Sequence, residues 1–175
     1  MSIPIKLRLD RFTSDARESL VYAHHDAHTV HKRPQIESFH LVSGVMGPNN
    51  PAQKAFSRQH IYYINVIELL GPKQGNPIVF KDRPQPDAVF NQAPFDSYFT
   101  PSALAVLQLA STIAVNSGRP NKIDTEDILE AAIKANDPQL DEFFRQAKVD
   151  TRRLIASMGR ADRGFDPARR HFLPG

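Results

Sequence analysis

The chain has 175 residues, no cysteine, and 22 basic against 19 acidic side chains, for a formal net charge of +3. This length suits one sizeable domain or two small ones. The lack of cysteine excludes a disulfide framework, thiol catalysis and a cysteine-ligated zinc site. No apolar run reaches the ~20 residues that cross a bilayer, so we expect no membrane span. The amino terminus lacks the pattern of a secretory signal, so we expect a cytoplasmic protein.

The second half of the chain repeats the first half. A shift of 87 positions lays Phe12 and Thr13 on Phe99 and Thr100, and the register then holds without a gap. Most identities lie at apolar or helix-capping positions, as expected if each copy builds the same helical unit. The other identical pairs are Ala16/Ala103, Leu20/Leu107, Ala23/Ala110, Ala27/Ala114, Ile36/Ile123, Asn49/Asn136, Pro51/Pro138, Phe56/Phe143, Arg58/Arg145 and Gln59/Gln146.

Each copy predicts four helices, and the first two have recognisable starts. The first helix follows Thr13 or Thr100, because threonine is a good N-cap. Its alanines and leucine recur at spacings of four, three and four, which forms one apolar stripe. Small alanines on that stripe allow a second helix to approach closely. The second helix begins near Ser38 or Thr125, which we interpret as capping residues.

The third and fourth helices are marked by proline and glycine. The third opens at Asn50 or Asp137, each an N-cap followed by proline at the first helical position. The fourth covers roughly residues 61–70 in the first copy and 151–158 in the second, each followed by a glycine. The whole pattern predicts an all-α protein with two tandem four-helix repeats.

The expected domain organisation comes from these repeats. Residues 1–158 form a single domain, with repeat one over 11–71, a proline-rich connector over 72–97 and repeat two over 98–158. Proline at the connector's density cannot continue a helix. Two apolar triplets of the connector, 78–80 and 88–90, form either a short hairpin or apolar contacts with the domain, and we favour contacts. Residues 159–175 are rich in Arg, Gly and Pro and predict an irregular tail.

These repeats resemble the amino-terminal domain of Clp-type chaperones. The resemblance covers residues 11–158, and the sharpest pieces are Arg11-Phe12-Thr13, Phe99-Thr100-Pro101 and Thr125-Glu126-Asp127-Ile128-Leu129. They are similar to the Phe-Thr and Thr-Glu-His-Leu-Leu motifs of that family. The implied fold is two four-helix repeats related by a pseudo-twofold axis.

The resemblance implies a binding function rather than catalysis. In Clp chaperones this domain precedes ATPase modules and receives substrates or adaptor proteins. This chain has no Gly-x-x-x-x-Gly-Lys-[Ser/Thr] phosphate loop, so it resembles stand-alone Clp N-like accessory proteins and is expected not to hydrolyse ATP. The implied partners are a Clp ATPase or peptidase, an adaptor, or unfolded protein substrates, with no cofactor. No nucleophile-elbow or zinc-protease motif argues for an enzyme.

The resemblance also implies a ligand site. In Clp chaperones of Gram-positive bacteria, the Thr-Glu pair that opens the second helix of each repeat is similar to a phosphoarginine receptor. Thr125 and Glu126 keep this pair, whereas the first repeat has Ser38 and Phe39, so such a site would work once. Capping offers the plainer interpretation, with Thr125 as an N-cap and Glu126 as a first-turn acid. Phe39, if exposed, would contact an unfolded segment, and if buried it belongs to the core.

Two further clusters offer alternative interpretations. A helical face carries three histidines at spacings of four and three, His24, His28 and His31, which are the best candidates for metal ligands. We favour the alternative interpretation, in which they form a solvated face of the helix. The arginines of the tail, with Phe165 and Phe172, could bind nucleic acid, but the charge is diluted by acids. A nucleic-acid-binding or metal-responsive protein is therefore the alternative function. The tail arginines are Arg160, Arg163, Arg169 and Arg170.

Overall fold

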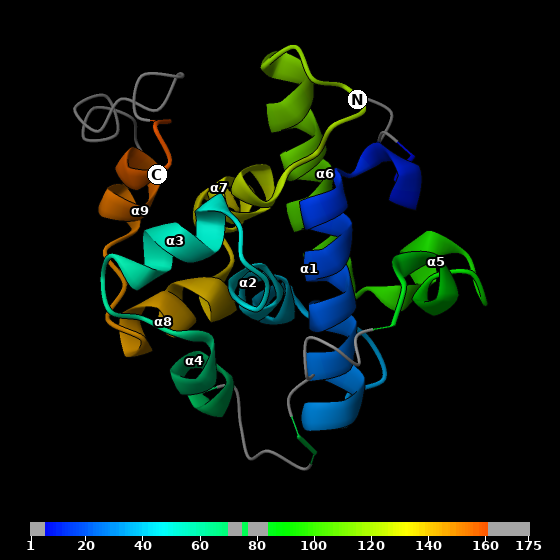
Figure 1. Ribbon diagram of the computed structural model, residues 1–175, viewed down its shortest axis with the longest axis horizontal. Helices are drawn as coiled ribbons and strands as arrows, with labels where there is room; N and C mark the ends of the chain where they lie inside the picture. The colour runs from blue at the N-terminus through cyan, green and yellow to red at the C-terminus, as the bar shows by residue number, and fades with distance from the viewer. Residues whose placement is uncertain (1–5, 70–74, 77–83, 161–175) are drawn as a thin grey trace.

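The computed structural model describes residues 6–69, 75–76 and 84–160, and this part of the chain is helical (Figure 1). The all-α expectation is confirmed. The described α-helices are α1 (Ser14–His25), α2 (Ser38–Met46), α3 (Pro51–Ser57), α4 (Tyr63–Leu69), α5 (Pro86–Val89), α6 (Pro101–Asn116), α7 (Thr125–Lys134), α8 (Pro138–Gln146) and α9 (Thr151–Ser157).

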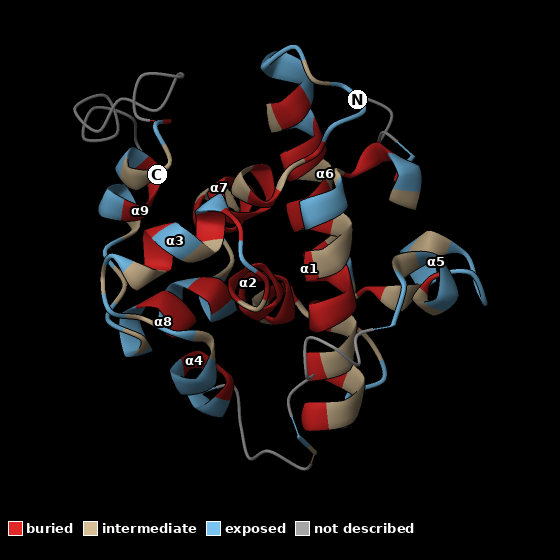
Figure 2. Cartoon of the chain, viewed as in Figure 1, coloured by how far each residue is buried: buried red, intermediate tan, exposed pale blue. Residues whose placement is uncertain are grey.

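The helices fall into two sets of four, as the repeat predicted. Helices α1 to α4 correspond to α6 to α9, and three of the four pairs start at positions that the 87-residue shift superimposes. Helix α1 packs on α2, α6 packs on α7, and α2 and α7 pack on each other between the repeats. Helix α2 lies near the centre of the fold, with helices of both repeats around it (Figure 1), and nearly all of its residues are buried (Figure 2).

Reciprocal backbone contacts relate the two repeats by a pseudo-twofold axis. Phe12 forms a parallel β-bridge with Ile123, and Phe99 forms one with Ile36. The Thr13 N–H donates to the Ile123 carbonyl at 2.9 Å, and the equivalent Thr100 N–H donates to the Ile36 carbonyl at 3.0 Å. Because each repeat supplies one half of both bridges, the repeats interlock.

Side-chain caps explain most of the helix starts. Thr13 and Thr100 accept from the Ala16 and Ala103 N–H groups at 3.2 Å each, as predicted. The prediction for the second helices is wrong by one residue, because the N-caps are Glu37 and Asp124. The β-bridges keep the backbone extended up to these two residues, so Ser38 and Thr125 are the first helical residues. Both side chains then point inward, and both residues are fully buried.

The continuation of α1 also departs from the simple helical expectation. Residues Asp26–Val30 form a π-helical segment directly after α1. A π-turn closes over five residues instead of four, so it rotates the residues after it relative to α1. His31 therefore lies on a different face from the one that its spacing predicts. Asp26 and His31 both point into the interior, at 0% and 6% exposure.

The described part of the connector is anchored by an aromatic side chain. Residues 86–89 form the short helix α5, so a strand over 88–90 is wrong and the apolar-contact interpretation is right for Phe90. Phe90 is 7% exposed and its ring lies 5.6 Å from that of Phe95. The apolar triplet 78–80, the expected helix end at residues 70–71 and the tail beyond Arg160 lie outside the described residues.

Close approach of α1 and α2 depends on small residues. A Cβ atom built on Gly44 would lie 2.4 Å from the Ser19 carbonyl oxygen and 3.0 Å from the Ala23 Cβ. Ala23 is fully buried at this crossing. The alanine stripe thus has the role that its spacing indicated. Among the described helices, none is long and apolar enough to cross a membrane.

Candidate functional site

An apolar groove lies between the two repeats, where the start of α2, the end of α4 and the outer side of α8 meet. Its volume is about 380 Å³. Phe39 and Leu69 come from repeat one, and Phe143 comes from repeat two. Leu69 is 44% exposed, and Phe39 is half-buried. The remaining lining residues are Pro138, Gln139, Glu142 and Gln146.

The groove is held in shape by contacts on its inner side. The centroids of the Phe39 and His40 rings lie 4.6 Å apart, so the two rings pack against each other. The Ser38 hydroxyl donates to Asp137 Oδ2 at 2.8 Å, and Asp137 is the N-cap of α8. This hydrogen bond fixes the start of α2 against the start of α8. Ser38, which was predicted as a site residue, therefore positions the groove, while Phe39 lines it.

The equivalent position in repeat two is charged. Glu126 stands where repeat one has Phe39, and its side chain is 18% exposed. Thr125 is fully buried, and its Oγ1 has no hydrogen-bond partner among the described residues. A hydroxyl in this place is not presented to a ligand in the structure described. Burial raises the pKa of Glu126, and the Arg160 guanidinium, 4.0 Å away, opposes that shift.

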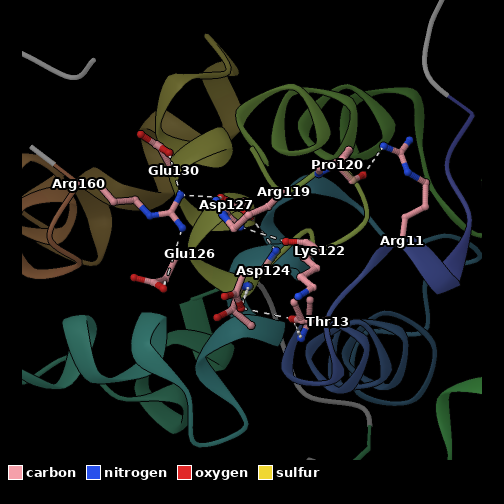
Figure 3. A network of polar contacts seen from close by, with 12 residues as sticks. Arg11, Thr13, Arg119, Pro120, Lys122, Asp124, Glu126, Asp127, Glu130 and Arg160 are labelled. Carbon is pink, nitrogen blue, oxygen red and sulfur yellow. Dashed lines mark hydrogen bonds and ion pairs between the residues drawn. The ribbon is translucent and has the colours of Figure 1, made fainter. Parts of the chain in front are cut away.

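Arg160 fills the space beside Glu126. Its Nη1 lies 2.6 Å from Asp127 Oδ1 and 3.0 Å from Glu130 Oε2, and its side chain is only 4% exposed. Figure 3 shows the guanidinium pointing toward all three carboxylates of α7. The sequence groups Arg160 with the arginines of an irregular tail, and residue 160 has no regular secondary structure, but its side chain is buried against α7. Glu126, Asp127 and Glu130 lie within about one turn of α7 and form a cluster of acids that needs a cation.

Two more cations complete the cluster. Arg119 forms a bidentate pair with Asp127 at 2.8 and 2.9 Å, and Lys134 lies 3.0 Å from Glu130. Burial raises the pKa of Asp127, but hydrogen bonds from Arg119, the Asp124 N–H and Arg160 outweigh it and hold this pKa below its usual value. Arg119, Lys134 and Arg160 also line a neighbouring cavity of about 650 Å³. Because each of these three cations is already paired with a carboxylate, they leave no uncompensated positive charge on the described lining of the cavity.

The three candidate metal-binding histidines do not come together. His24 and His28 stack with ring centroids 4.1 Å apart, and burial, with His28 close by, lowers the pKa of His24 to about 4. His31 points inward instead and lies 3.2 Å from His40. The π-helical segment before His31 causes this separation. Within the described residues, no three potential metal ligands gather at one place.

Sequence reasoning did not identify three residues that matter here. Leu69 and Phe143 were expected to be apolar positions of helices, with no sign that they face each other. Arg160 was grouped with the tail arginines. The predicted cap at Asp137 marks the start of α8, but a cap does not indicate which other helix lies beside it. Which side chains meet there depends on how the repeats pack.

The described part of the chain thus consists of two interlocked four-helix repeats with an apolar groove between them. The family model described as the Clp repeat (R) N-terminal domain matches residues 11–147. The chain therefore belongs to the Clp repeat N-terminal domain family. In Clp chaperones this domain is a non-catalytic module that binds substrates and adaptors.

Solved structures show the same fold. The crystal structure of the N-terminal domain of the caseinolytic protease associated chaperone ClpD from Arabidopsis thaliana matches with a TM-score of 0.65. The match covers 90% of this chain and 98% of that chain at 15% sequence identity. At this identity the likeness concerns the fold alone. A search of curated proteins finds no match to the sequence.

Proposed function

We propose that this protein is a non-catalytic binding module that acts as an accessory, adaptor or regulator of a Clp-type chaperone–protease in the cytoplasm. Its partners would be a Clp ATPase or peptidase, an adaptor, or unfolded protein substrates. The groove between the repeats supports this proposal best. It combines an exposed leucine, a half-buried phenylalanine and contributions from both repeats.

The chemistry of the groove favours an apolar segment of an extended chain. Burying one large apolar side chain contributes about 1.5–3 kcal/mol, so a groove of this size supports weak, reversible capture. Glu142 at the rim is already paired with Arg145 and Gln146, so the rim adds little charge preference. Weak capture with little selectivity suits a protein that presents many clients.

Thr125 and Glu126 in repeat two form a second candidate site in this proposal. Thr125 and Glu126 could receive a phosphoarginine only after Arg160 has moved, because its guanidinium already lies beside the Glu126 carboxylate. The buried Thr125 hydroxyl would also have to turn outward. We therefore propose that Thr125 and Glu126 form a ligand site only when Arg160 is displaced. While Arg160 stays in place, we expect binding at the apolar groove that Phe39 lines.

Binding of a labelled unfolded polypeptide, followed by fluorescence anisotropy, tests the groove. Leu69→Ser removes an exposed aliphatic side chain from it, and Val115→Ser removes one of similar exposure, 40% against 44%, from the far end of α6. We expect about tenfold weaker binding for Leu69→Ser, which corresponds to about 1.4 kcal/mol, and no change for Val115→Ser. Equal affinities for both variants would refute binding at this groove.

Capture of partners from lysate tests the biological assignment. The wild-type chain should retain a Clp ATPase, its peptidase or unfolded clients, and Leu69→Ser should retain less of each. The alternative function, nucleic-acid binding, predicts retention that is lost with nuclease and falls steeply with added salt. The structure gives that alternative less support than composition did, since Arg160 is committed to buried carboxylates.

A further inference from the structure

Helix α4 (Tyr63–Leu69), which carries Leu69 of the groove, is held by two polar contacts, one buried and one partly buried, as well as by its apolar face. The Tyr63 hydroxyl donates to Asp26 Oδ1, and His31 Nε2 lies 3.2 Å from the Ile67 carbonyl oxygen. Val66 and Ile67 are buried beneath the helix. A helix of seven residues does not persist in water by itself, so its position depends on these contacts.

The contact to Ile67 is the end of a chain of hydrogen bonds that starts at α2. The Glu37 N–H donates to His40 Nδ1 at 3.1 Å, and His40 Nε2 lies 3.2 Å from His31 Nδ1. A backbone N–H can only donate, so His40 Nδ1 must be the acceptor and the His40 proton lies on Nε2. His40 then donates to His31 Nδ1, and the His31 proton lies on Nε2, facing the Ile67 carbonyl.

This arrangement is satisfied by a single protonation state. Both imidazoles must be neutral, with each proton on Nε2. A proton added to His40 Nδ1 would face the Glu37 N–H, and one added to His31 Nδ1 would face the His40 N–H. In each case two donors meet, so the hydrogen bond from Glu37 to His40, or the one from His40 to His31, is replaced by repulsion. Loss of the second bond frees the ring of His31, whose Nε2 carries the contact with Ile67 of α4.

The surroundings of the two histidines contain little that could stabilise a positive charge. His40 is fully buried, and burial together with nearby His31, Arg33 and His28 lowers the pKa of His40 to about 3. Burial and Arg33 also lower the pKa of His31, whereas the hydrogen bond to Ile67, a contact with the Asp26 backbone and the Glu37 charge raise it. The net direction for the pKa of His31 is down.

Asp26 acts in the opposite sense. Ser43 on α2 and Tyr63 on α4 both donate to it, with Tyr22 of α1 also nearby. Burial raises the pKa of Asp26 to about 7, although these hydrogen bonds oppose the shift. A fall in pH protonates this buried carboxylate, which favours the packed position of α4. The same fall in pH disfavours the neutral histidine pair. At low pH the two histidines therefore destabilise the packed position of α4, and the one carboxylate stabilises it.

We propose that α4 is a pH-released wall of the groove, held in place by the neutral His40–His31–Ile67 hydrogen-bond chain and detached when the two histidines become protonated. Detachment removes Leu69 from the groove and exposes Val66 and Ile67. The consequence for binding rests on the proposed function of the groove, but the release of α4 itself does not. Helix α9 is the counterpart of α4 in repeat two. The residues of repeat two that correspond to His40 and His31 are Asp127 and Gly118, so among the described residues α9 is not held by a histidine chain.

Hydrogen exchange of the full chain without any peptide tests the release. Amide protection of α4, corrected for the intrinsic exchange rate, is compared between pH 7.5 and pH 5.0, with α9 as the internal control. With two histidines opposed by one carboxylate, protection of α4 should fall about tenfold. Asp26→Asn removes an opposing contribution of about 100-fold, because the pKa of Asp26 is raised to about 7, and should enlarge the fall to about 1,000-fold. Protection of α9 should change far less.

The ring signals of His31 and His40, followed by NMR on the wild-type chain, give a readout that needs no variant. They should titrate together with the loss of α4 protection. The proposal is overturned if α4 and α9 lose protection equally, if either histidine titrates at its ordinary pKa while α4 stays protected, or if Asp26→Asn leaves the pH dependence unchanged. Peptide affinity of Leu69→Ser at pH 7.5 tests the groove separately, so the two ideas can fail independently.

Discussion

Removal of the Arg160 guanidinium is the sharpest perturbation that the fold offers. Arg160→Ala would leave Asp127, which is fully buried, and Glu130, which is 3% exposed, with one cation fewer. Breaking a buried ion pair by removing one partner costs about 3–5 kcal/mol. Asp127 keeps its bidentate Arg119 and Glu130 keeps Lys134, so we expect the low end of this range, a loss of about 3 kcal/mol of unfolding free energy.

Urea unfolding followed by circular dichroism measures this loss. The matched control is Arg145→Ala, which breaks an exposed pair with Glu142 and should leave the midpoint unchanged. Arg160→Lys should recover only part of the stability, because an ammonium cannot reach two carboxylates with the fork geometry of a guanidinium. If Arg160→Ala costs no more than Arg145→Ala, the buried cluster does not stabilise the domain as inferred.

The pH dependence of the stability of Arg160→Ala tests whether the charge of Asp127 stabilises the fold. The pKa of Asp127 is held below its ordinary value, so its contribution to stability is present above about pH 4 and is lost as pH falls through the folded-state pKa. The difference between wild type and Arg160→Ala should therefore be constant near neutrality and shrink below about pH 4. A difference that grows in acid would contradict the assigned electrostatics.

Two further substitutions probe the first repeat. Because burial raises the pKa of Asp26 to about 7, its stabilising protonated form is lost as pH rises through that value. Asp26→Asn should therefore raise the unfolding free energy at pH 8.5, by up to about 4 kcal/mol before the weakened hydrogen bonds are deducted, and by much less at pH 4, in urea titrations at both values. Gly44→Ala places a Cβ 2.4 Å from the Ser19 carbonyl oxygen and should cost about 1–3 kcal/mol. A thermal melt of Gly44→Ala that matches wild type would show that α1 and α2 can separate freely.

Much of the fold could be predicted because its signals are local. Thr13, Thr100, Asn50 and Asp137 cap helices through side-chain contacts with N–H groups two or three residues away. The 87-residue register then placed equivalent helices in both halves. The one-residue error at Ser38 and Thr125 arose because the β-bridges that set the start of α2 and α7 come from the other repeat.

The candidate site was less predictable, because its residues are far apart in sequence. Ser38 and Asp137 are 99 positions apart, yet they join the starts of α2 and α8. His31 reaches Ile67 over 36 positions, and Arg160 reaches Glu130 over 30. Such pairs leave no trace in composition, periodicity or motif spacing.

Local chemistry therefore decided the helices, their repetition and the family, since caps, prolines and apolar spacing act within a few residues of one another. Packing of the two repeats across the pseudo-twofold axis decided which side chains stay open to a ligand. It left Phe39 and Leu69 on an accessible groove, although a helical pattern alone would make both core candidates. It also buried Arg160 among three carboxylates, because only the docked position of α9 brings that guanidinium to α7.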